Sequence, residues 1–215
     1  KQGVKNTLIE SARMQSNVSV TYDELRKNPK LAAAAILAEL MRWISNCSVR
    51  RQARRHARNM LSSRYVMTWK RQPGGGRLMK CRLCVRGFLN KQRNDIDRYS
   101  GTSTRWGQRS VVATAVQRGW NIASLDIAMA FLRGMTFDEI QESKGGPRSE
   151  VSMQLPRGRP GLEPSGSALL RQCTGFESFD DATVVLEMLK GGFGLVDAPI
   201  LFTTRVDNIL KAEGM

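Results

Sequence analysis

The spacing of apolar residues along the chain predicts three amphipathic helices. The first begins at Asn28-Pro29, a pair typical of a helix start, and continues through 31–44, a stretch rich in Ala, Leu and Met. Its larger apolar side chains fall on one face, at Ile36, Leu40, Trp43 and Ile44. A second helix is predicted over 108–118, ending at Gly119, and a third from Asp197 through Leu210.

Alternating apolar and basic residues predict a β-hairpin between the first two helices. Residues 65–70 are rich in β-forming types, and Pro73-Gly74-Gly75-Gly76 supplies a turn. Residues 79–88 form the returning strand, in which Cys81, Leu83 and Val85 alternate with cations. Two strands of this kind, joined by a glycine loop, would form a basic arm suited to a phosphate chain.

Four other segments are less regular. Residues 50–58 are predicted to be an exposed basic helix, and 120–127 a buried strand that has Asp126 near its end. Residues 141–167 are rich in Gly, Pro, Ser and charge, which favours a loop excursion. Residues 182–189 are apolar and fit either a strand or a short helix.

These elements indicate an α+β fold in which helices pack on an antiparallel sheet. We expect three parts: a weakly ordered leader over 1–30, a basic helix with the hairpin over 31–118, and a C-terminal part over 119–215. The hydrophobic share of 41% is enough for a real core.

The charge distribution changes the picture, because the net charge of +15 is concentrated in one third of the chain. Between Arg42 and Arg109 there are 18 Lys and Arg but only two acids, Asp95 and Asp97. Such a block repels itself unless an anion lies on it, so we expect a polyanionic partner: nucleic acid first, an anionic membrane surface second. An apolar run long enough for a membrane span is not found in the sequence, nor is a secretory signal, and we expect an intracellular protein, in a cytoplasmic particle or the nucleus.

The cysteine and histidine residues give little indication of a metal-binding or catalytic role. Cys81-x-x-Cys84 has no second ligand pair, which a structural zinc site needs, and positions three apart in a strand face opposite sides. His56 lies among arginines and fits a basic surface.

Asp126 is more informative. A carboxylate that ends a buried strand is costly unless it is compensated, either by a divalent metal or by capping the following turn.

Seven segments, in order, resemble the reverse transcriptases of copia-type retrotransposons. They are Arg64-Tyr65-Val66-x-x-Trp69-Lys70, Lys80-Cys81-Arg82-Leu83-Cys84-Val85-Arg86-Gly87-Phe88, Asp97-x-Tyr99-Ser100, Gly119-Trp120, Asp126-x-x-x-Ala130-Phe131-Leu132-x-Gly134, Met153-x-x-Pro156-x-Gly158 and Gly194-Leu195-x-x-Ala198-Pro199. The resemblance covers about residues 31–215 and implies part of a right-hand polymerase: the fingers hairpin and, over 119–215, a partial palm with the first catalytic motif.

The resemblance also implies roles for individual residues. Asp126 would be the catalytic ligand of two Mg²⁺ ions, or Mn²⁺, with the Ile127 carbonyl helping. Phe131 would exclude nucleotides that carry a 2′-hydroxyl, although it could also be an ordinary residue of the hydrophobic core. Arg82 would hold the incoming triphosphate with its planar guanidinium. Lys70 would be a second cation, unless it is merely solvated or Arg71 or Lys80 takes that role.

The remaining matched residues would lie near template and primer: Lys80, Arg86, Gly194, Leu195 and Pro199. Gly194 could equally be an ordinary glycine at a helix start. The implied partners are an RNA template, a DNA primer, deoxynucleoside triphosphates and the integrase and ribonuclease H parts of the polyprotein, and no membrane.

The implied activity is that of an RNA-directed DNA polymerase, which adds deoxynucleotides to a primer 3′-hydroxyl. It needs a second pair of carboxylates, in an aromatic-x-Asp-Asp hairpin that we expect beyond Met215. Phe179-Asp180-Asp181 comes too early in the order and suits a helix cap or turn. This portion alone is therefore not expected to polymerise. The alternative is a degenerate or domesticated transposon-derived protein that only binds nucleic acid.

Overall fold

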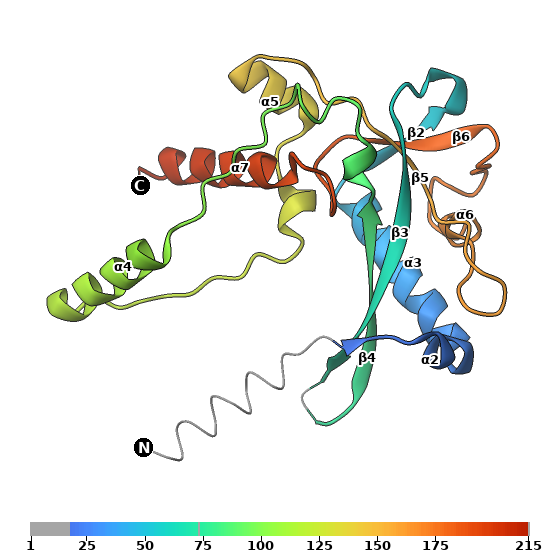
Figure 1. Cartoon of the computed structure of the whole chain (residues 1–215), viewed down its shortest axis with the longest axis horizontal. Coiled ribbons are helices and arrows are strands. Elements are labelled where there is room, and N and C mark those ends of the chain that lie inside the picture. The colour runs from blue at the N-terminus through green and yellow to red at the C-terminus, as the bar shows by residue number, and fades with distance from the viewer. Residues whose placement is uncertain (1–17, 73, 215) are drawn as a thin grey trace.

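The long strand β3 (Met60–Arg71) joins two halves of one six-stranded sheet (Figure 1). The computed structural model describes residues 18–72 and 74–214. From Ser63 onward, β3 pairs antiparallel with β4 (Arg77–Val85), and β1 (Val18–Ser19) pairs with β3 near its end. Residues 60–62 of β3 pair parallel with β5 (Ser152–Gln154). The order then continues through β6 (Val184–Met188) to β2 (Val49–Ala53), both antiparallel.

The predicted α+β class is therefore confirmed in its coarse form, a mostly antiparallel sheet with helices packed on it. The hairpin is confirmed as well. Cys81, Leu83 and Val85 are buried, while Arg82 on the same strand is exposed, as an alternating strand requires. Strands of residues 31–118 and of 119–215 share this one sheet, so the boundary expected at 118 does not separate two units of the fold.

The predicted first helix is confirmed as α3 (Pro29–Ser45), which packs on β4. Ile36, Leu40 and Trp43 on its apolar face are at most 1% exposed. The predicted C-terminal helix is confirmed as α7 (Ala198–Ala212). None of the helices in the described part of the chain is long and apolar enough to cross a membrane.

The expectation of a weakly ordered leader over 1–30 is wrong for residues 18–30; residues 1–17 lie outside the described part of the chain. β1 pairs with Thr68 and Trp69 of β3, and α2 (Tyr22–Lys27) follows it. Thr21 and Glu24 cap α2 reciprocally, each side chain bonding the other residue's backbone N–H. Glu24 also accepts a hydrogen bond from Trp69 Nε1 at 3.0 Å, which ties α2 to the hairpin.

The helix predicted over 50–58 is also wrong, because this segment forms β2 and the short 3-10 helix η1 (Arg54–His56). Strand β6 offers an edge that β2 completes with five residue pairs, and a distant partner of this kind outweighs local helical propensity. Arg50 of β2 donates two hydrogen bonds to Glu187 of β6, at 2.7 and 3.0 Å.

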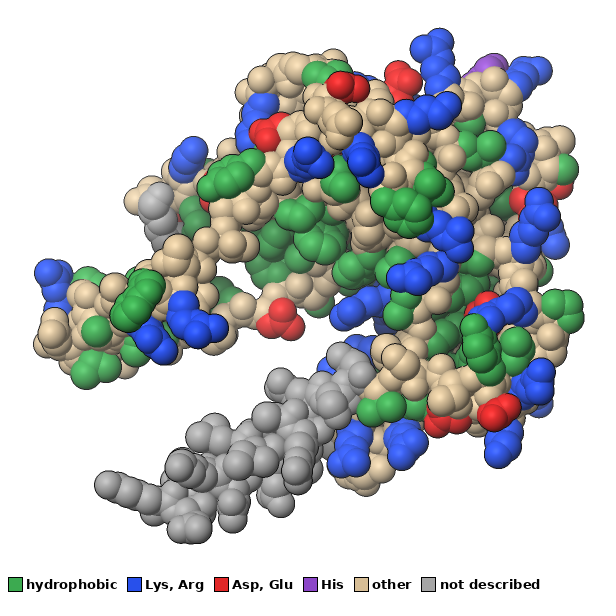
Figure 2. Space-filling model, viewed as in Figure 1, with side chains coloured by type: hydrophobic (Ala, Val, Ile, Leu, Met, Phe, Trp, Pro, Cys, Tyr) green, Lys and Arg blue, Asp and Glu red, His purple; other side chains and the backbone are tan. Residues whose placement is uncertain are grey.

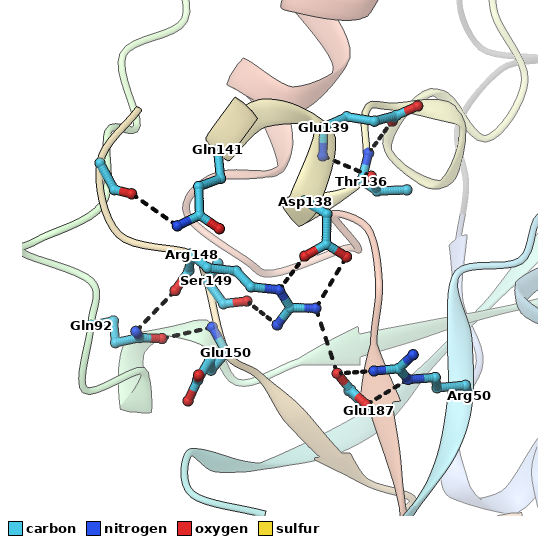
Figure 3. Close-up of polar contacts among 11 residues, drawn as sticks. Arg50, Gln92, Thr136, Asp138, Glu139, Gln141, Arg148, Ser149, Glu150 and Glu187 are labelled. Atoms are coloured by element: carbon cyan, nitrogen blue, oxygen red, sulfur yellow. Dashed lines mark hydrogen bonds and ion pairs between the residues drawn. The ribbon is translucent and has the colours of Figure 1, made fainter. Parts of the chain in front are cut away.

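Glu187 also belongs to a polar network that joins this sheet edge to α5 (Phe137–Lys144) (Figure 3). The Arg148 guanidinium lies between Glu187 and Asp138 of α5 and pairs with both. The network raises the pKa of Arg148, chiefly through the hydrogen bond to Asp138, and holds the start of β5 in place.

The buried strand expected over 120–127 is absent from the described structure, and this is the main correction. Helix α4 (Arg105–Arg118) ends at Gly119 in the left-handed region, as predicted. The following residues have no regular structure, and Leu125 is 91% exposed. No strand of the described residues pairs with this segment, so its backbone groups are left to the solvent. Together with α4 it forms an arm that leaves the body of the molecule (Figure 1).

Three short elements complete the fold: α6 (Gly166–Leu170) and the 3-10 turns η2 (Gly87–Leu89) and η3 (Ala130–Arg133). The excursion expected over 141–167 is correct only in part, because it includes the end of α5 and all of β5. Residues 184–188, where strand and helix were both open, form β6.

Candidate functional site

The cations of the hairpin and the segment around Asp126 line one cavity of about 720 Å³. They come from two motifs that are far apart in the sequence. Six of the residues singled out from the sequence lie in this lining: Lys70, Lys80, Arg82, Asp126, Ile127 and Phe131. The others are Glu39, Arg42, Thr68, Cys81, Ala128, Met129, Ala130 and Phe193.

The cationic wall follows from strand geometry. Thr68 is paired with Lys80, and Val66 with Arg82, so the side chains of Lys80 and Arg82 share one face of the hairpin with Thr68 and Lys70. Burial lowers the pKa of Lys80, and the charges of Lys70, Arg42 and Arg82 lower it further. The cations therefore repel one another, and an anion in the cavity would relieve that repulsion.

An aromatic pair lies beside Arg82 in the cavity lining. The Arg82 guanidinium lies 5.4 Å from the centre of the Phe193 ring. Phe193 in turn meets Phe131 edge to face, with ring centres 5.6 Å apart. Such contacts are each worth about 0.5–1.5 kcal/mol and orient the groups that make them. Phe131 is half-buried and packs against the core while it lines the cavity, so both of its predicted roles are compatible with its position.

Asp126 reaches the cavity from an exposed, irregular segment rather than from the end of a buried strand. It makes no hydrogen bond within the described residues, so the capping role considered from the sequence is not seen there. Glu39 is the other carboxylate of the lining, and it is already engaged. Its oxygens accept from Trp43 Nε1 at 3.1 Å and the Leu83 N–H at 3.2 Å, and it pairs with Arg42.

Among the described residues, Asp126 is thus the one carboxylate of the lining without a hydrogen-bond or ion-pair partner, and it could serve a metal ion. In the part of the chain that the structure describes, three or more His, Cys, Asp or Glu side chains nowhere gather as a metal site would require. One carboxylate fits a Mg²⁺ ion that is also held by substrate phosphates, since Mg²⁺ is often bound in this way. It does not by itself fit a pair of metal ions.

The Gly194-Leu195-x-x-Ala198-Pro199 segment lies beside the end of β4 and is not part of the cavity lining. The Val85 N–H donates to the Phe193 carbonyl at 2.8 Å. Gly194 has a φ of +94°, and a Cβ there would overlap the carbonyl oxygen of Val85. A Cβ on Gly87 would likewise overlap the carbonyl of Gly194, so both glycines are required for this close approach.

Four residues with predicted template or primer roles are not in the cavity lining. Leu195 is buried in the core, and Pro199 lies in the first turn of α7. Gly194 allows the close contact between its backbone and the Val85 carbonyl of β4. Arg86 is exposed beyond the end of β4, where its backbone N–H donates to the Ser62 carbonyl and its carbonyl accepts from the Leu89 N–H.

Sequence reasoning missed Arg42, Glu39 and Phe193. Glu39 could have been found, because a carboxylate one turn before Trp43 on an apolar helix face needs a partner. Arg42 and Phe193 gave no such signal, since only the packing of α3 and of residue 193 against the hairpin brings them to the cavity.

The remaining candidates behave as structural residues. Burial raises the pKa of both Cys81 and Cys84, which makes the thiols poor metal ligands. His56 is exposed and accepts a hydrogen bond from Arg55. Asp180 accepts from the Ala182 N–H and the Thr183 hydroxyl, the turn predicted for Phe179-Asp180-Asp181.

Comparison of the chain with protein-family models, curated proteins and solved structures finds no match.

Proposed function

We propose that this chain binds nucleic acid and a nucleoside triphosphate as the fingers and first part of the palm of a copia-type reverse transcriptase. The parent protein would be an RNA-directed DNA polymerase that adds deoxynucleotides to a primer 3′-hydroxyl. One observation supports this most: the cations of the hairpin motif and the Asp126, Ile127 and Phe131 of the second motif share one cavity.

The cavity is suited to a triphosphate. Arg82 offers two parallel N–H donors to phosphate oxygens, and its contact with Phe193 orients the guanidinium before the ligand arrives. Lys70, Lys80 and Arg42 add charge around the same space. Phe131 supplies an apolar wall, where a ring under the sugar would disfavour a 2′-hydroxyl.

Asp126, with the carbonyl of Ile127, is the group that would hold a Mg²⁺ ion accompanying the triphosphate. When bound, such an ion supplies charge neutralisation to the phosphates. The residues of this chain do the rest: Arg82 and the lysines position the phosphates, and Phe131 limits the sugar.

The outer surface is suited to the polyanion itself. Lys and Arg side chains are spread over the hairpin and α4 in Figure 2. On the α4 arm, exposed tryptophans lie beside arginines: Arg109 is 5.4 Å from the Trp106 ring and Arg118 is 5.1 Å from the Trp120 ring. Exposed aromatic rings next to cations are typical of surfaces on which single-stranded bases stack.

The test is binding of a labelled RNA–DNA primer-template, followed by fluorescence anisotropy across a salt series. We expect the logarithm of the affinity to fall linearly with the logarithm of salt concentration. An affinity that does not depend on salt would contradict the proposal.

A second candidate function is favoured by the single uncommitted carboxylate of the cavity: a nucleic-acid-binding protein without polymerase activity. Primer extension with Mg²⁺ or Mn²⁺ by a longer protein that includes the expected aromatic-x-Asp-Asp hairpin separates the two. Extension that Asp126→Asn abolishes supports the polymerase. Tight, salt-dependent binding without extension by that longer protein supports the binding protein.

A further inference from the structure

A second cavity of about 170 Å³ lies between α5 and the start of α7. It shares no lining residue with the cavity that contains Asp126. Phe137 and Ile140 of α5 and Ile200 and Leu201 of α7 form apolar walls, and Asp197 and Ser149 are the polar groups set among them. Ser149 is held firmly, because the preceding Arg148 is paired with Asp138 and Glu187 (Figure 3).

Asp197 is buried without a partner. It is 2% exposed, and neither of its carboxylate oxygens has a hydrogen-bond partner in the described part of the chain. Although it precedes α7, its side chain does not cap that helix. The Ser149 hydroxyl, in a residue that is 4% exposed, is likewise without a partner among the described residues.

Such an arrangement is costly in the free protein. Burial raises the pKa of Asp197, and the nearby Ser149 hydroxyl and the backbone N–H of Asp197 itself offset that rise only in part. Leaving buried polar groups unsatisfied is rare in folded proteins, and each instance calls for a group that satisfies them.

We propose that this cavity binds a primary ammonium group on a short alkyl stem. An ammonium has three donors, and the cavity presents three acceptors that have no partner among the described residues: the two oxygens of Asp197 and the hydroxyl of Ser149. The walls of Phe137, Ile140 and Ile200 match an alkyl stem. Asp95 and Asp97 also line the cavity, against the single base Lys144, so its charge favours a cation.

Two other occupants fit less well. A water molecule has two donors and no charge, so it leaves one acceptor and the charge of Asp197 uncompensated. A metal ion needs several protein ligands, and in the described residues such a group of side chains is not found. The ammonium has two possible sources, a free amine or the lysine side chain of a partner protein.

The experiment measures binding of n-butylammonium to the whole 215-residue chain by NMR titration. The neutral n-butanol has a similar shape and lacks the charge, so we expect it to bind at least about tenfold more weakly. A second arm uses N-acetyl-lysine-methylamide. Binding of this larger probe as tight as that of n-butylammonium assigns a lysine side chain, and much weaker binding assigns a free amine.

Variants locate the site. Asp197→Asn should weaken n-butylammonium binding at least about tenfold, whereas Asp207→Asn, an exposed aspartate on α7, should leave it unchanged. If Asp197→Asn does not fold, Ser149→Ala removes one acceptor and should weaken binding severalfold. Equal binding of the amine and the alcohol, unchanged binding in a folded Asp197→Asn variant, or no saturable binding of n-butylammonium would overturn the proposal and leave a water-filled cavity.

Discussion

The guanidinium of Arg82 lies over the ring of Phe193, 5.4 Å from its centre, and so connects the hairpin with the segment that precedes α7. The Val85 N–H, on the same strand, donates to the carbonyl of Phe193. The backbone of β4 therefore fixes Phe193, and Phe193 fixes the direction of Arg82. A cation oriented in advance loses less side-chain entropy when it binds an anion.

Replacing Arg82 with alanine should weaken triphosphate binding at least about tenfold, because a charge-assisted, bidentate contact is lost. Arg86→Ala is the matched control, since Arg86 is exposed near the same strand but does not line the cavity. Isothermal titration calorimetry with a deoxynucleoside triphosphate measures both. Equal losses in the two variants would mean that only the general basic charge matters.

The lowered pKa of Lys80 predicts that the protein takes up a proton when it binds a triphosphate. This pKa is lowered by burial and by Lys70, Arg42 and Arg82, and a bound triphosphate should raise it again. At alkaline pH, binding should therefore take protons from the buffer, which calorimetry in two buffers of different ionisation enthalpy detects. Lys80→Met should abolish this uptake, and an unchanged uptake in that variant would exclude Lys80 as its source.

The same shift sets a pH dependence of stability in the free protein. The folded state gives up the Lys80 proton at a lower pH than the unfolded state does, so across that interval the unfolded state binds more protons. The contribution of Lys80 to the free energy of unfolding therefore rises with pH there.

Asp126→Asn should have opposite effects with and without Mg²⁺. Without the ion, the variant should bind triphosphate a few fold more tightly, because a carboxylate near the phosphates repels them by about 1 kcal/mol in water. With Mg²⁺, the wild type should bind more tightly, since Asp126 then helps to hold the ion. Asp207→Asn serves as the control. The same sign of effect in both conditions would argue against a metal role for Asp126.

Gly194→Ala should destabilise the fold by about 1–3 kcal/mol or more, because its positive φ strains an alanine and the new Cβ meets the carbonyl of Val85. Gly119→Ala is the comparison, since Gly119 also has a positive φ but nothing lies within 4 Å of its Cβ position. Urea unfolding followed by circular dichroism gives both values. A loss at Gly194 no larger than at Gly119 would show that the approach to β4 can relax.

Glu39→Leu should also destabilise the protein, by about 1–3 kcal/mol for each buried donor left without an acceptor. The donors are Trp43 Nε1 and the Leu83 N–H, which both point to the same oxygen. Glu39→Gln keeps that oxygen and should stay within about 1 kcal/mol of the wild type, because it loses mainly the half-exposed pair with Arg42. Chemical unfolding of both variants distinguishes a hydrogen-bonding role from one of charge.

Segments whose partners are local could be predicted from the sequence. The hairpin needed only its alternation and the glycine turn, and α4 ended at Gly119 because glycine adopts the left-handed conformation there. Residues 50–58 and 120–127 could not be predicted in the same way. The first became a strand because it pairs with the distant strand β6, and the second pairs with no strand of the described residues.

The same distinction between local and long-range interactions applies to the candidate site. The sequence by itself determined that Lys80 and Arg82 share a face, because side chains alternate along a strand, and that the net positive charge is concentrated between Arg42 and Arg109. Only the tertiary structure decided that Asp126 lines the same cavity as those cations, that Phe193 orients Arg82, and that Asp197 is buried without a partner among the described residues. The physical reason is that a sequence pattern reports how residues near one another in the chain are oriented. Which side chains are buried, and which distant side chains come close together, depends on how the elements pack.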